Sequence, residues 1–419
     1  MRPIYPRRGC RSIFSDPKIP VFLSEKVCYG RRKSRGGKAL EEAAGRYDVA
    51  VVGAGIAGAS VACELAREAS VVLIERESQP GYHTTGRSAA LFSAIYGPAQ
   101  IRALSRASLP YFRNPPAGFT ATPLLSPRGV LMVARQDQLA PLEAMRREVF
   151  ARGSVEVMDG AATQRMMPLL REGYAAAAIF EEDASDIDVH ALHQGYLRAF
   201  RAAGGKLALD GEVVGLDRSA EGWRVSTRHR SFRAGIVVNA AGAWADELAG
   251  LAGAGPVGLT PRRRTALTVA VPEGTNPAHW PMVVDIEEKF YLKPESGRLL
   301  LSPADETPSP PCDARPDEMD VAVCVDRIET AFDLTVRTIE NRWAGLRTFA
   351  PDGNPVVGFD PAAAGFFWLA GQGGYGIQTA PAMARLAAAL ALGRGVPADI
   401  ADEGVDAGAL APARLERAA

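Results

Sequence analysis

Three glycines and one acidic residue near the start of the chain have the types and spacing needed to hold a dinucleotide. Gly53, Gly55 and Gly58 follow an apolar run at residues 49–52. Glu75 ends a second apolar run. In a strand–turn–helix–strand unit, the first glycine forms the tight turn, the second lets the backbone approach a pyrophosphate, and the third lets the helix pack on the strand. The helix N-terminus offers N–H groups to the phosphates, and the acid accepts hydrogen bonds from a ribose. The motif predicts a bound dinucleotide without distinguishing NAD from FAD.

Two further places in the chain repeat the order of strand, glycine and helix. The apolar run at residues 232–238 leads into Gly242, and the run at residues 366–370 leads into a glycine-dense loop. Backbone without side chains can lie flat against a large planar ligand, and a following helix N-terminus stabilises negative charge on it. We call each strand–glycine–helix sequence a glycine crossing. Three glycine crossings this far apart in the chain indicate one long ligand, bound by a domain that is assembled from separate segments. A nicotinamide dehydrogenase usually keeps its nucleotide fold contiguous, so the pattern favours FAD.

Length and composition narrow the class of protein. The chain has 419 residues, enough for two lobes, and balances 48 Lys and Arg against 48 Asp and Glu. This balance does not indicate a nucleic-acid partner, and no apolar run is long enough to span a membrane. The five cysteines form no CxxC pair, which favours reduced thiols in a cytoplasmic protein. His190 and His193 stand one helical turn apart, but no acid or cysteine completes a metal-ligand set, so we interpret them as helix-surface residues.

The remaining periodicities place these residues in an α/β fold with two domains. We predict a Rossmann-like FAD-binding domain built from discontinuous segments, and a substrate-binding domain built on a mainly antiparallel sheet. The first comprises residues 45–100, 181–256 and 340–400, the second residues 101–180 and 257–339, and residues 401–419 form a C-terminal tail. Residues 1–44 are rich in Lys and Arg and are expected to be a disordered arm, either a targeting segment or the result of a start site read too far upstream.

Three local expectations follow from the pattern. A helix is predicted to start at Ser88 or just after it. Asp188 is the predicted N-cap of a helix over residues 190–203. Period-two alternation puts Arg262 and Arg264 on one face of a strand and the arginine between them on the other.

The chain resembles the flavin-dependent amine oxidoreductases of the D-amino acid oxidase superfamily, above all the bacterial FAD-dependent D-amino acid dehydrogenases that include D-arginine dehydrogenase. The resemblance covers nearly all of residues 46–415. It is carried by the stretches YDVAVVGAGIAGAS, QPGYHTTGRSAA, NPPAGF with PLLSPR, DIDVHALHQGYLR, VVNAAGAW, FYLKP, WAGLR and QGGYGIQT. Together these stretches are far more specific than the dinucleotide motif.

The resemblance implies an FAD site and, since no cysteine lies near the WAGLR or QGGYG segments, non-covalent binding. Glu75 then faces the ribose of the adenosine half of FAD. The implied cofactor-binding residues are Gly53, Gly55, Ile56, Ala57, Gly58, Glu75, Arg76, Thr84, Ser88, Ala89, Ala90, Val213, Gly242, Trp244, Gly373, Gly374, Tyr375, Gly376, Ile377 and Gln378. No metal is implied.

The resemblance also implies how an amino acid is held. Arg264 and Arg347 would bind the α-carboxylate, because a guanidinium pairs bidentately with a carboxylate, and the Tyr291 hydroxyl would add a hydrogen bond. The remaining implied roles are the substrate amine near Gly345, a mobile lid at Tyr96, and Gln378 beside the flavin pyrimidine ring. The reaction would be hydride transfer from Cα to flavin N5, followed by hydrolysis of the imine to a 2-keto acid and ammonia.

Two departures from the arginine-preferring relative bear on the substrate. Leu91 stands where that relative has a histidine, and Val130 stands where it has an acid that meets the cationic side chain. A buried guanidinium facing two apolar residues would lose its partners, so we expect a preference for neutral or apolar D-amino acids.

Several alternatives stay open at the level of the sequence. One is a glycine- or sarcosine-type oxidase that uses oxygen, and another is an FAD-dependent 2-hydroxy acid or glycerol-phosphate dehydrogenase. A non-enzymatic flavoprotein is disfavoured by the set of Arg264, Tyr291 and Arg347. The expected electron acceptor is a quinone or another non-oxygen carrier, and the expected location is the cytoplasm, with or without peripheral attachment to the inner membrane.

Overall fold

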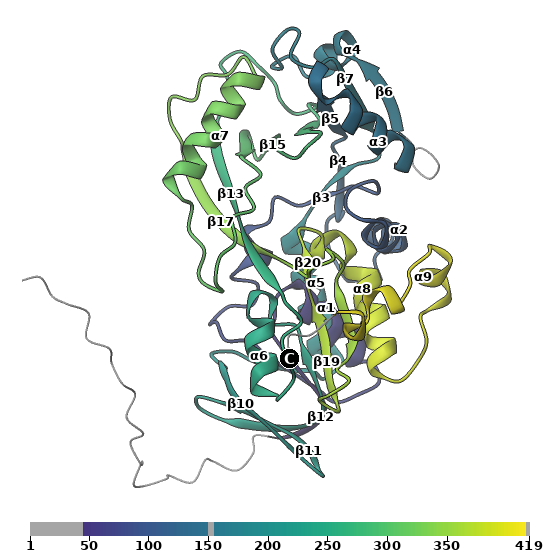
Figure 1. Ribbon diagram of the computed structural model, residues 1–419. Helices are drawn as coiled ribbons and strands as arrows, with labels where there is room; N and C mark the ends of the chain where they lie inside the picture. The colour runs from purple at the N-terminus through teal and green to yellow at the C-terminus, as the bar shows by residue number, and fades with distance from the viewer. Residues whose placement is uncertain (1–44, 150–154, 416–419) are drawn as a thin grey trace, which may run out of the picture. The chain divides into compact units, whose positions relative to one another are not determined.

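The structure, a computed structural model, describes residues 45–149 and 155–415, so the predicted arm at residues 1–44 lies outside it. Within these residues, an eight-stranded sheet carries the first glycine motif (Figure 1). Strand β12 pairs in parallel with β1 on one edge. On its other edge it pairs first with β11, which is antiparallel, and then with β19, which is parallel; β2 and β9 continue beyond β1. The strands are β1 (Arg46–Val52), β2 (Val71–Ile74), β9 (Lys206–Ala208), β10 (Val213–Ser219), β11 (Gly222–Thr227), β12 (Ser231–Asn239), β18 (Val356–Phe359) and β19 (Phe366–Ala370).

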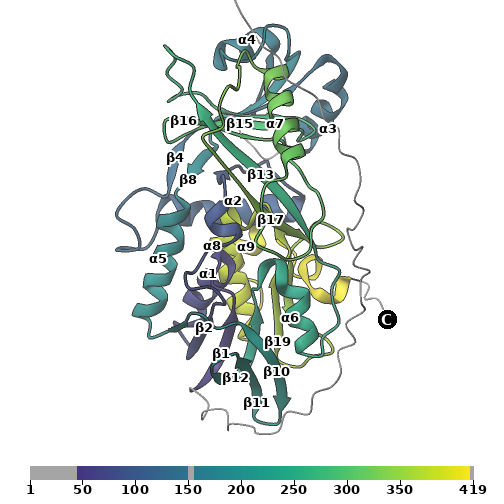
Figure 2. The ribbon, with the colours of Figure 1, turned by 90° about the vertical axis from the view of Figure 1, so that its left-hand side faces the viewer.

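Helices cover both faces of this sheet, which is why β2 and the second half of β1 are apolar and buried on both faces. Val49 and Val51 of β1 belong to one core, and Ala50 and Val52 to another, because successive side chains of a strand point to opposite faces. The first core is shared with α1 (Ile56–Leu65), α2 (Ala99–Arg113), α5 (Val189–Ala202) and α8 (Gly376–Ala391), and the second with α6 (Ala245–Leu251) (Figure 2). The chain therefore has the layered α/β architecture that the sequence predicts.

A second sheet of nine strands is mainly antiparallel, with one parallel pair between β5 and β14. Its order is β20–β17–β13–β16–β15–β14–β5–β7–β6. The strands are β5 (Val130–Ala134), β6 (Val155–Asp159), β7 (Ala177–Glu181), β13 (Thr260–Ala270), β14 (Met282–Asp285), β15 (Tyr291–Glu295), β16 (Arg298–Ser302), β17 (Asn341–Phe349) and β20 (Gln372–Gly373). Helix α7 (Glu318–Ala331) packs its apolar side on this sheet, and α3 (Leu139–Val149) and α4 (Gly160–Met166) flank the β5–β7 end.

The register of β13 with β17 sets the arginines of the candidate site. Arg262 lies opposite Arg347, and Arg264 lies opposite Gly345. The predicted alternation is confirmed, because Arg262 and Arg264 both pair with Glu306, whereas Arg263 turns the other way to Asp320 on α7.

Two local expectations have different outcomes. Asp188 is the N-cap of α5, and its side chain accepts a hydrogen bond of 2.8 Å from the Ala191 N–H. The helix predicted at Ser88 is wrong. A short 3-10 turn at Thr84–Arg87 is followed by extended backbone at Ser88 and by β3 (Leu91–Phe92), which joins β8 (Ser185–Ile187) and β4 (Leu125–Pro127) in a small third sheet. Pairing with β8 gives this segment backbone partners that a local pattern cannot reveal.

The end of the described chain packs on the helices that cover the eight-stranded sheet. After α9 (Ala398–Asp402), Leu410 is fully buried in the same core as α1 and α8, and Arg414 forms an ion pair with Asp352. No helix in residues 45–149 or 155–415 is long and apolar enough to cross a membrane.

Candidate active site

A cavity of about 620 Å³ lies where the three glycine crossings meet. It is placed at the carboxyl ends of β1, β2 and β12, the edge at which open parallel sheets bind their ligands. Most predicted cofactor-binding residues line it: Gly53, Gly55, Ile56, Ala57, Glu75, Arg76, Thr84, Ser88, Ala89, Val213, Gly242, Trp244, Gly373, Gly374, Gly376 and Ile377. Segments far apart in the chain thus enclose one cavity.

The first glycine turn is packed so closely that it admits no side chain. Gly53 has a φ of 98°, and a Cβ there would lie 2.4 Å from the Ala240 carbonyl oxygen. A Cβ at Gly58 would lie 1.8 Å from the Gly53 carbonyl oxygen, so α1 rests directly on the turn. Gly55 is the N-cap of α1 and faces the cavity, where it has no side chain to block the helix N-terminus. This arrangement fits a pyrophosphate.

Glu75 lies at the end of β2 on the cavity wall, and its side chain is held by the backbone. One carboxylate oxygen accepts a hydrogen bond of 2.7 Å from the Ala54 N–H, and the other accepts one of 3.0 Å from the Glu77 N–H. Burial raises the pKa of Glu75, and the two N–H donors oppose this increase. Each carboxylate oxygen has a further lone pair for a hydroxyl donor in the cavity.

One end of the large cavity has aromatic and aliphatic walls. The Arg76 guanidinium lies 4.7 Å from the centre of the Trp244 ring, and Val213 and Leu248 line the cavity beside them. A flat base of a nucleotide fits such a surface, since stacking and burial of apolar area both favour it.

A smaller cavity of about 70 Å³ adjoins the large one and shares Ser88, Ala89, Arg264, Tyr291, Arg347, Gly374 and Ile377 with it. Arg347 comes from β17 and Tyr291 from β15. In the part of the chain that the structure describes, no carboxylate forms an ion pair with Arg347 and no hydrogen bond is made by the Tyr291 hydroxyl. Burial alone would lower the pKa of Arg347, but the neighbouring Tyr96, Tyr291 and Glu288 raise it above its ordinary value. The guanidinium therefore stays charged and faces the cavity.

Arg264 is the other predicted carboxylate ligand, and it already has partners. Its side chain is 7% exposed, its Nη2 donates to a Glu306 carboxylate oxygen at 3.0 Å, and its Nε donates to the Asp305 carbonyl oxygen at 2.9 Å. The structure brings Arg264 to the cavity wall but leaves Arg347 as the cation with free hydrogen-bonding capacity.

The rest of the small cavity is mainly apolar. Leu91 of β3 and Val130 of β5, the two positions singled out as departures, both line it. The other apolar side chains on its wall are Met132, Met282, Val284 and Ala304. The methionines and Val284 were not predicted, although their two-residue spacing from Val130 and from each other places them on one face of paired strands.

Tyr96 and Glu288 meet at the edge of the small cavity. The Tyr96 hydroxyl donates a hydrogen bond of 3.0 Å to a Glu288 carboxylate oxygen, and the Tyr96 ring packs edge-on against Tyr375 with centroids 5.1 Å apart. Burial and the nearby carboxylate raise the pKa of Tyr96, so its hydroxyl remains a proton donor. Glu288 was not predicted as a site residue; its place three residues before Tyr291, in a polar turn, was the available signal.

The other predicted site residues lie as follows. Gly345 lines the large cavity, and Ala90 and Gln378 line the small one, whereas Gly58 and Tyr375 line neither. The Gln378 amide is committed to the protein, since it accepts from the Ser93 N–H at 3.2 Å and donates to the Ser105 hydroxyl at 3.0 Å.

The structure corrects the interpretation of His193. His190 is exposed, but His193 is 4% exposed, and its Nε2 lies 2.9 Å from the Ala54 carbonyl oxygen beside the first glycine turn. It is a buried support of the large cavity and not a surface residue. No group of His, Cys, Asp and Glu among the described residues could hold a metal ion.

Comparison with known proteins agrees with this geometry. The sequence profile of the family described as DAO, FAD dependent oxidoreductase, matches residues 48–390. FAD-dependent oxidoreductase domain-containing protein 1 of Mus musculus is 26% identical over 82% of this chain and 81% of its own length. Glycine oxidase of Geobacillus kaustophilus is 26% identical over 82% of this chain and 93% of its own.

Solved structures show the same fold. The crystal structure of glycine oxidase from Geobacillus kaustophilus has a TM-score of 0.72 at 25% identity and covers 86% of this chain and 98% of its own. An L-alpha-glycerophosphate oxidase from Mycoplasma pneumoniae with FAD bound has a TM-score of 0.75 at 20% identity, and covers 83% of this chain and 95% of its own.

Proposed function

The chain belongs to the family of FAD-dependent oxidoreductases, and from this premise we propose that it oxidises the Cα–N bond of small neutral or apolar D-amino acids. FAD is its cofactor, and the cavity with the three glycine crossings fits both halves of that molecule. Its reaction belongs to the oxidation of amines or amino acids at a carbon–nitrogen bond. The stereochemistry and the side-chain preference are the proposed part.

An amino acid carries a carboxylate and a side chain, and the small cavity offers a matching group for each. Arg347 presents a charged guanidinium without an ion-pair partner among the described residues, and Tyr291 presents a hydroxyl. Leu91, Val130 and their neighbours present an apolar wall. This juxtaposition of an apolar wall with a cation that lacks an ion-pair partner among the described residues, next to the FAD cavity, is the observation that carries the proposal.

The chain itself contributes orientation and charge. Arg347 would bind the α-carboxylate bidentately and Tyr291 would donate a hydrogen bond to it, which fixes the Cα. FAD, when bound, supplies the acceptor for the hydride that leaves the Cα. Tyr96 and Glu288 would close the cavity edge, and water would hydrolyse the released imine to a 2-keto acid and ammonia. Gly345 near the amine and Gln378 near the flavin remain predicted roles.

The apolar wall argues against a cationic side chain. A guanidinium or ammonium placed against Leu91 and Val130 would lose its water without gaining a partner, which costs several kcal/mol. The carboxylate among the described lining residues of the small cavity, Glu288, already accepts a hydrogen bond from Tyr96.

A test is to mix the anaerobic FAD-loaded protein with a panel of D- and L-amino acids and to follow bleaching of the flavin. We expect bleaching by D-Met, D-Leu and D-Phe, with higher kcat/KM than for D-Arg or D-Lys, and none by the L-enantiomers. Higher kcat/KM for D-Arg and D-Lys would contradict the proposed preference. Bleaching by 2-hydroxy acids alone would indicate a hydroxy-acid dehydrogenase instead.

The second candidate function is a glycine- or sarcosine-type amine oxidase. It is favoured by the volume of the small cavity, about 70 Å³, and by the similarity to proteins named glycine oxidase. Glycine and sarcosine therefore belong in the panel, and a higher kcat/KM for either than for D-Met would favour this candidate.

The electron acceptor is proposed to be a quinone or another non-oxygen carrier. Comparison of peroxide formation with reduction of a quinone analogue tests this, and equal rates with oxygen would contradict it.

The FAD is proposed to be non-covalent, since neither cavity has a cysteine among its described lining residues. A yellow pellet after acid precipitation would contradict that. The cytoplasmic location remains a prediction for cell fractionation.

A further inference from the structure

The turn between β14 and β15 holds a strained residue at the edge of the small cavity. Glu288 has a φ of 55°, in the left-handed region that side chains other than those of glycine and asparagine rarely adopt. Such a conformation costs about 1 kcal/mol or more and persists only where the surroundings hold it. The consequence is that Glu288 reaches across to the Tyr96 hydroxyl.

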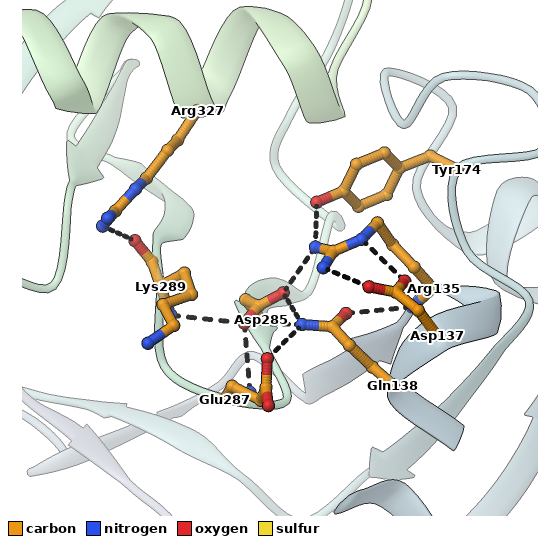
Figure 3. A network of polar contacts seen from close by, with 8 residues as sticks. All are labelled: Arg135, Asp137, Gln138, Tyr174, Asp285, Glu287, Lys289 and Arg327. Carbon is orange, nitrogen blue, oxygen red and sulfur yellow. Dashed lines mark hydrogen bonds and ion pairs between the residues drawn. The ribbon is translucent and has the colours of Figure 1, made fainter. Parts of the chain in front are cut away.

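A buried carboxylate, that of Asp285, holds this turn through the residues on either side of Glu288 (Figure 3). Asp285 is 1% exposed and ends β14. One of its oxygens accepts hydrogen bonds from the backbone N–H groups of Glu287 at 3.0 Å and Lys289 at 3.3 Å, on either side of Glu288. Arg327 of α7 fixes the far end, because its Nη1 donates to the Lys289 carbonyl oxygen at 2.6 Å. The left-handed residue is thus clamped at both of its neighbours.

Gln138 holds Asp285 in turn. It is 2% exposed, precedes α3 and lines neither cavity. Its amide nitrogen lies 3.1 and 3.3 Å from the two Asp285 oxygens and 2.9 Å from a Glu287 oxygen, and its amide oxygen accepts from the Arg135 N–H at 3.1 Å (Figure 3). The Arg135 guanidinium adds an ion pair at 3.6 Å to one of the same oxygens, so the orientation of the buried Asp285 carboxylate depends jointly on this guanidinium and on the Gln138 amide, the nearer of the two.

The segment that carries Tyr96 is held in a similar way from the opposite side. Glu181 is 3% exposed, and its two oxygens accept hydrogen bonds from the Ser93 hydroxyl at 2.5 Å and the Ala94 N–H at 2.8 Å. Two separately anchored segments, residues 93–97 and 286–290, therefore meet through the contact between Tyr96 and Glu288.

We propose that Gln138 is a positioning residue: through Asp285 it sets the 286–290 turn, and through Glu288 and Tyr96 it sets how the substrate cavity closes. The effect on catalysis rests on the proposed function, whereas the structural coupling of Gln138 to residues 93–97 does not.

Hydrogen exchange of the FAD-loaded protein tests the coupling without any substrate. In Gln138→Leu we expect exchange to rise about fivefold in residues 286–290 and also in residues 93–97, the factor given by loss of one hydrogen bond. The matched control is Gln164→Leu in α4, which removes a side-chain amide that donates to the Leu170 carbonyl oxygen instead of to a carboxylate, and which lines neither cavity. Its exchange at 93–97 should equal that of the wild type.

A rise confined to residues 286–290, or a rise at 93–97 equal in both variants, would overturn the positioning role. If Gln138→Leu does not fold, Gln138→Asn shortens the side chain by one methylene and permits the same comparison.

Steady-state kinetics of single and double variants test whether Gln138 and Glu288 act through the same contact. We expect kcat/KM for D-Met to fall about fivefold in Gln138→Leu and in Glu288→Gln, and to fall no further in the double variant, since both act through one contact. Additive losses would overturn the shared path. If the wild type oxidises no amino acid, the proposed function fails, while the exchange experiment still decides the coupling.

Discussion

Arg347 and Arg264 come from neighbouring strands and line the same cavities, yet their surroundings differ. Arg264 is neutralised by Glu306 and hydrogen-bonded to the Asp305 carbonyl, whereas Arg347 has no ion-pair partner in the described part of the chain. An incoming carboxylate would gain most from the cation that is not already paired. The two arginines are therefore expected to contribute unequally to binding.

The first prediction concerns this difference. Arg347→Ala should lower kcat/KM for D-Met by roughly 10²–10⁴, because two charge-assisted hydrogen bonds of about 1.5–3 kcal/mol each are lost. Arg262→Ala is the control: it removes an arginine from the same strand pair, but this side chain is 40% exposed, pairs with Glu306 and lines neither cavity. Its effect should stay below about fivefold. Equal losses in both variants would contradict a carboxylate-binding role.

The second prediction concerns Glu75. Glu75→Gln should raise the dissociation constant of FAD about tenfold, since the neutral amide offers weaker acceptance to ribose hydroxyls and leaves one of two N–H donors without an oxygen. FAD fluorescence titration of the apoprotein measures the constant. Glu64→Gln, on α1 but outside the cavity lining, should keep the wild-type value.

At the scale of elements, the closest packing in the site is between α1 and the turn after β1. A side chain at Gly58 has no room, and α1 must therefore move away from the turn to accept one. Because α1 also packs on α5 and α8, movement of its first turn disturbs both the fold and the cavity.

The third prediction tests that contact. Gly58→Ala should destabilise the protein by roughly 1–3 kcal/mol or more and weaken FAD retention, because its Cβ would overlap the Gly53 carbonyl oxygen. Gly250→Ala in α6 meets open space and should be neutral or stabilising by up to about 1 kcal/mol. Thermal unfolding and FAD release report both, and equal shifts would show that close packing is not the cause.

At the scale of the whole molecule, one buried histidine links helix α5 to the FAD cavity. Burial lowers the pKa of His193, its contact with the Ala54 carbonyl oxygen opposes this, and His190 adds a small further decrease. Near pH 6.5, the His193 imidazole therefore binds a proton more readily in the unfolded chain than in the folded chain. The contribution of His193 to the free energy of unfolding is therefore fully present above about pH 6.5 and is lost as the pH falls below that value.

The fourth prediction follows from that sign. Between about pH 7 and pH 5, the wild type should lose thermal stability and release FAD more steeply than His193→Gln, which keeps a donor for the Ala54 carbonyl and cannot titrate. His190→Gln, exposed on the same helix, should retain nearly the wild-type slope. Identical slopes in the wild type and His193→Gln would place the acid sensitivity elsewhere.

The sequence by itself determined the elements and the cofactor class. The turn at Gly53, the helices and strands, and the alternation of Arg262 and Arg264 depend on local periodicity and on backbone conformations that few residues permit. The three glycine crossings pointed to FAD for the same reason, since each constraint acts within a short segment. The motif stretches then extended this to an oxidoreductase of amines or amino acids.

Only the tertiary structure decided what each site residue can do. Which of Arg264 and Arg347 is ion-paired depends on Glu306, whether His193 is buried depends on the packing of α5, and the extended path at Ser88 depends on pairing with β8. The small cavity is built from strands and turns that are separate in the chain. Charge, burial and hydrogen-bond partners are set by contacts between distant segments, and no local pattern contains them.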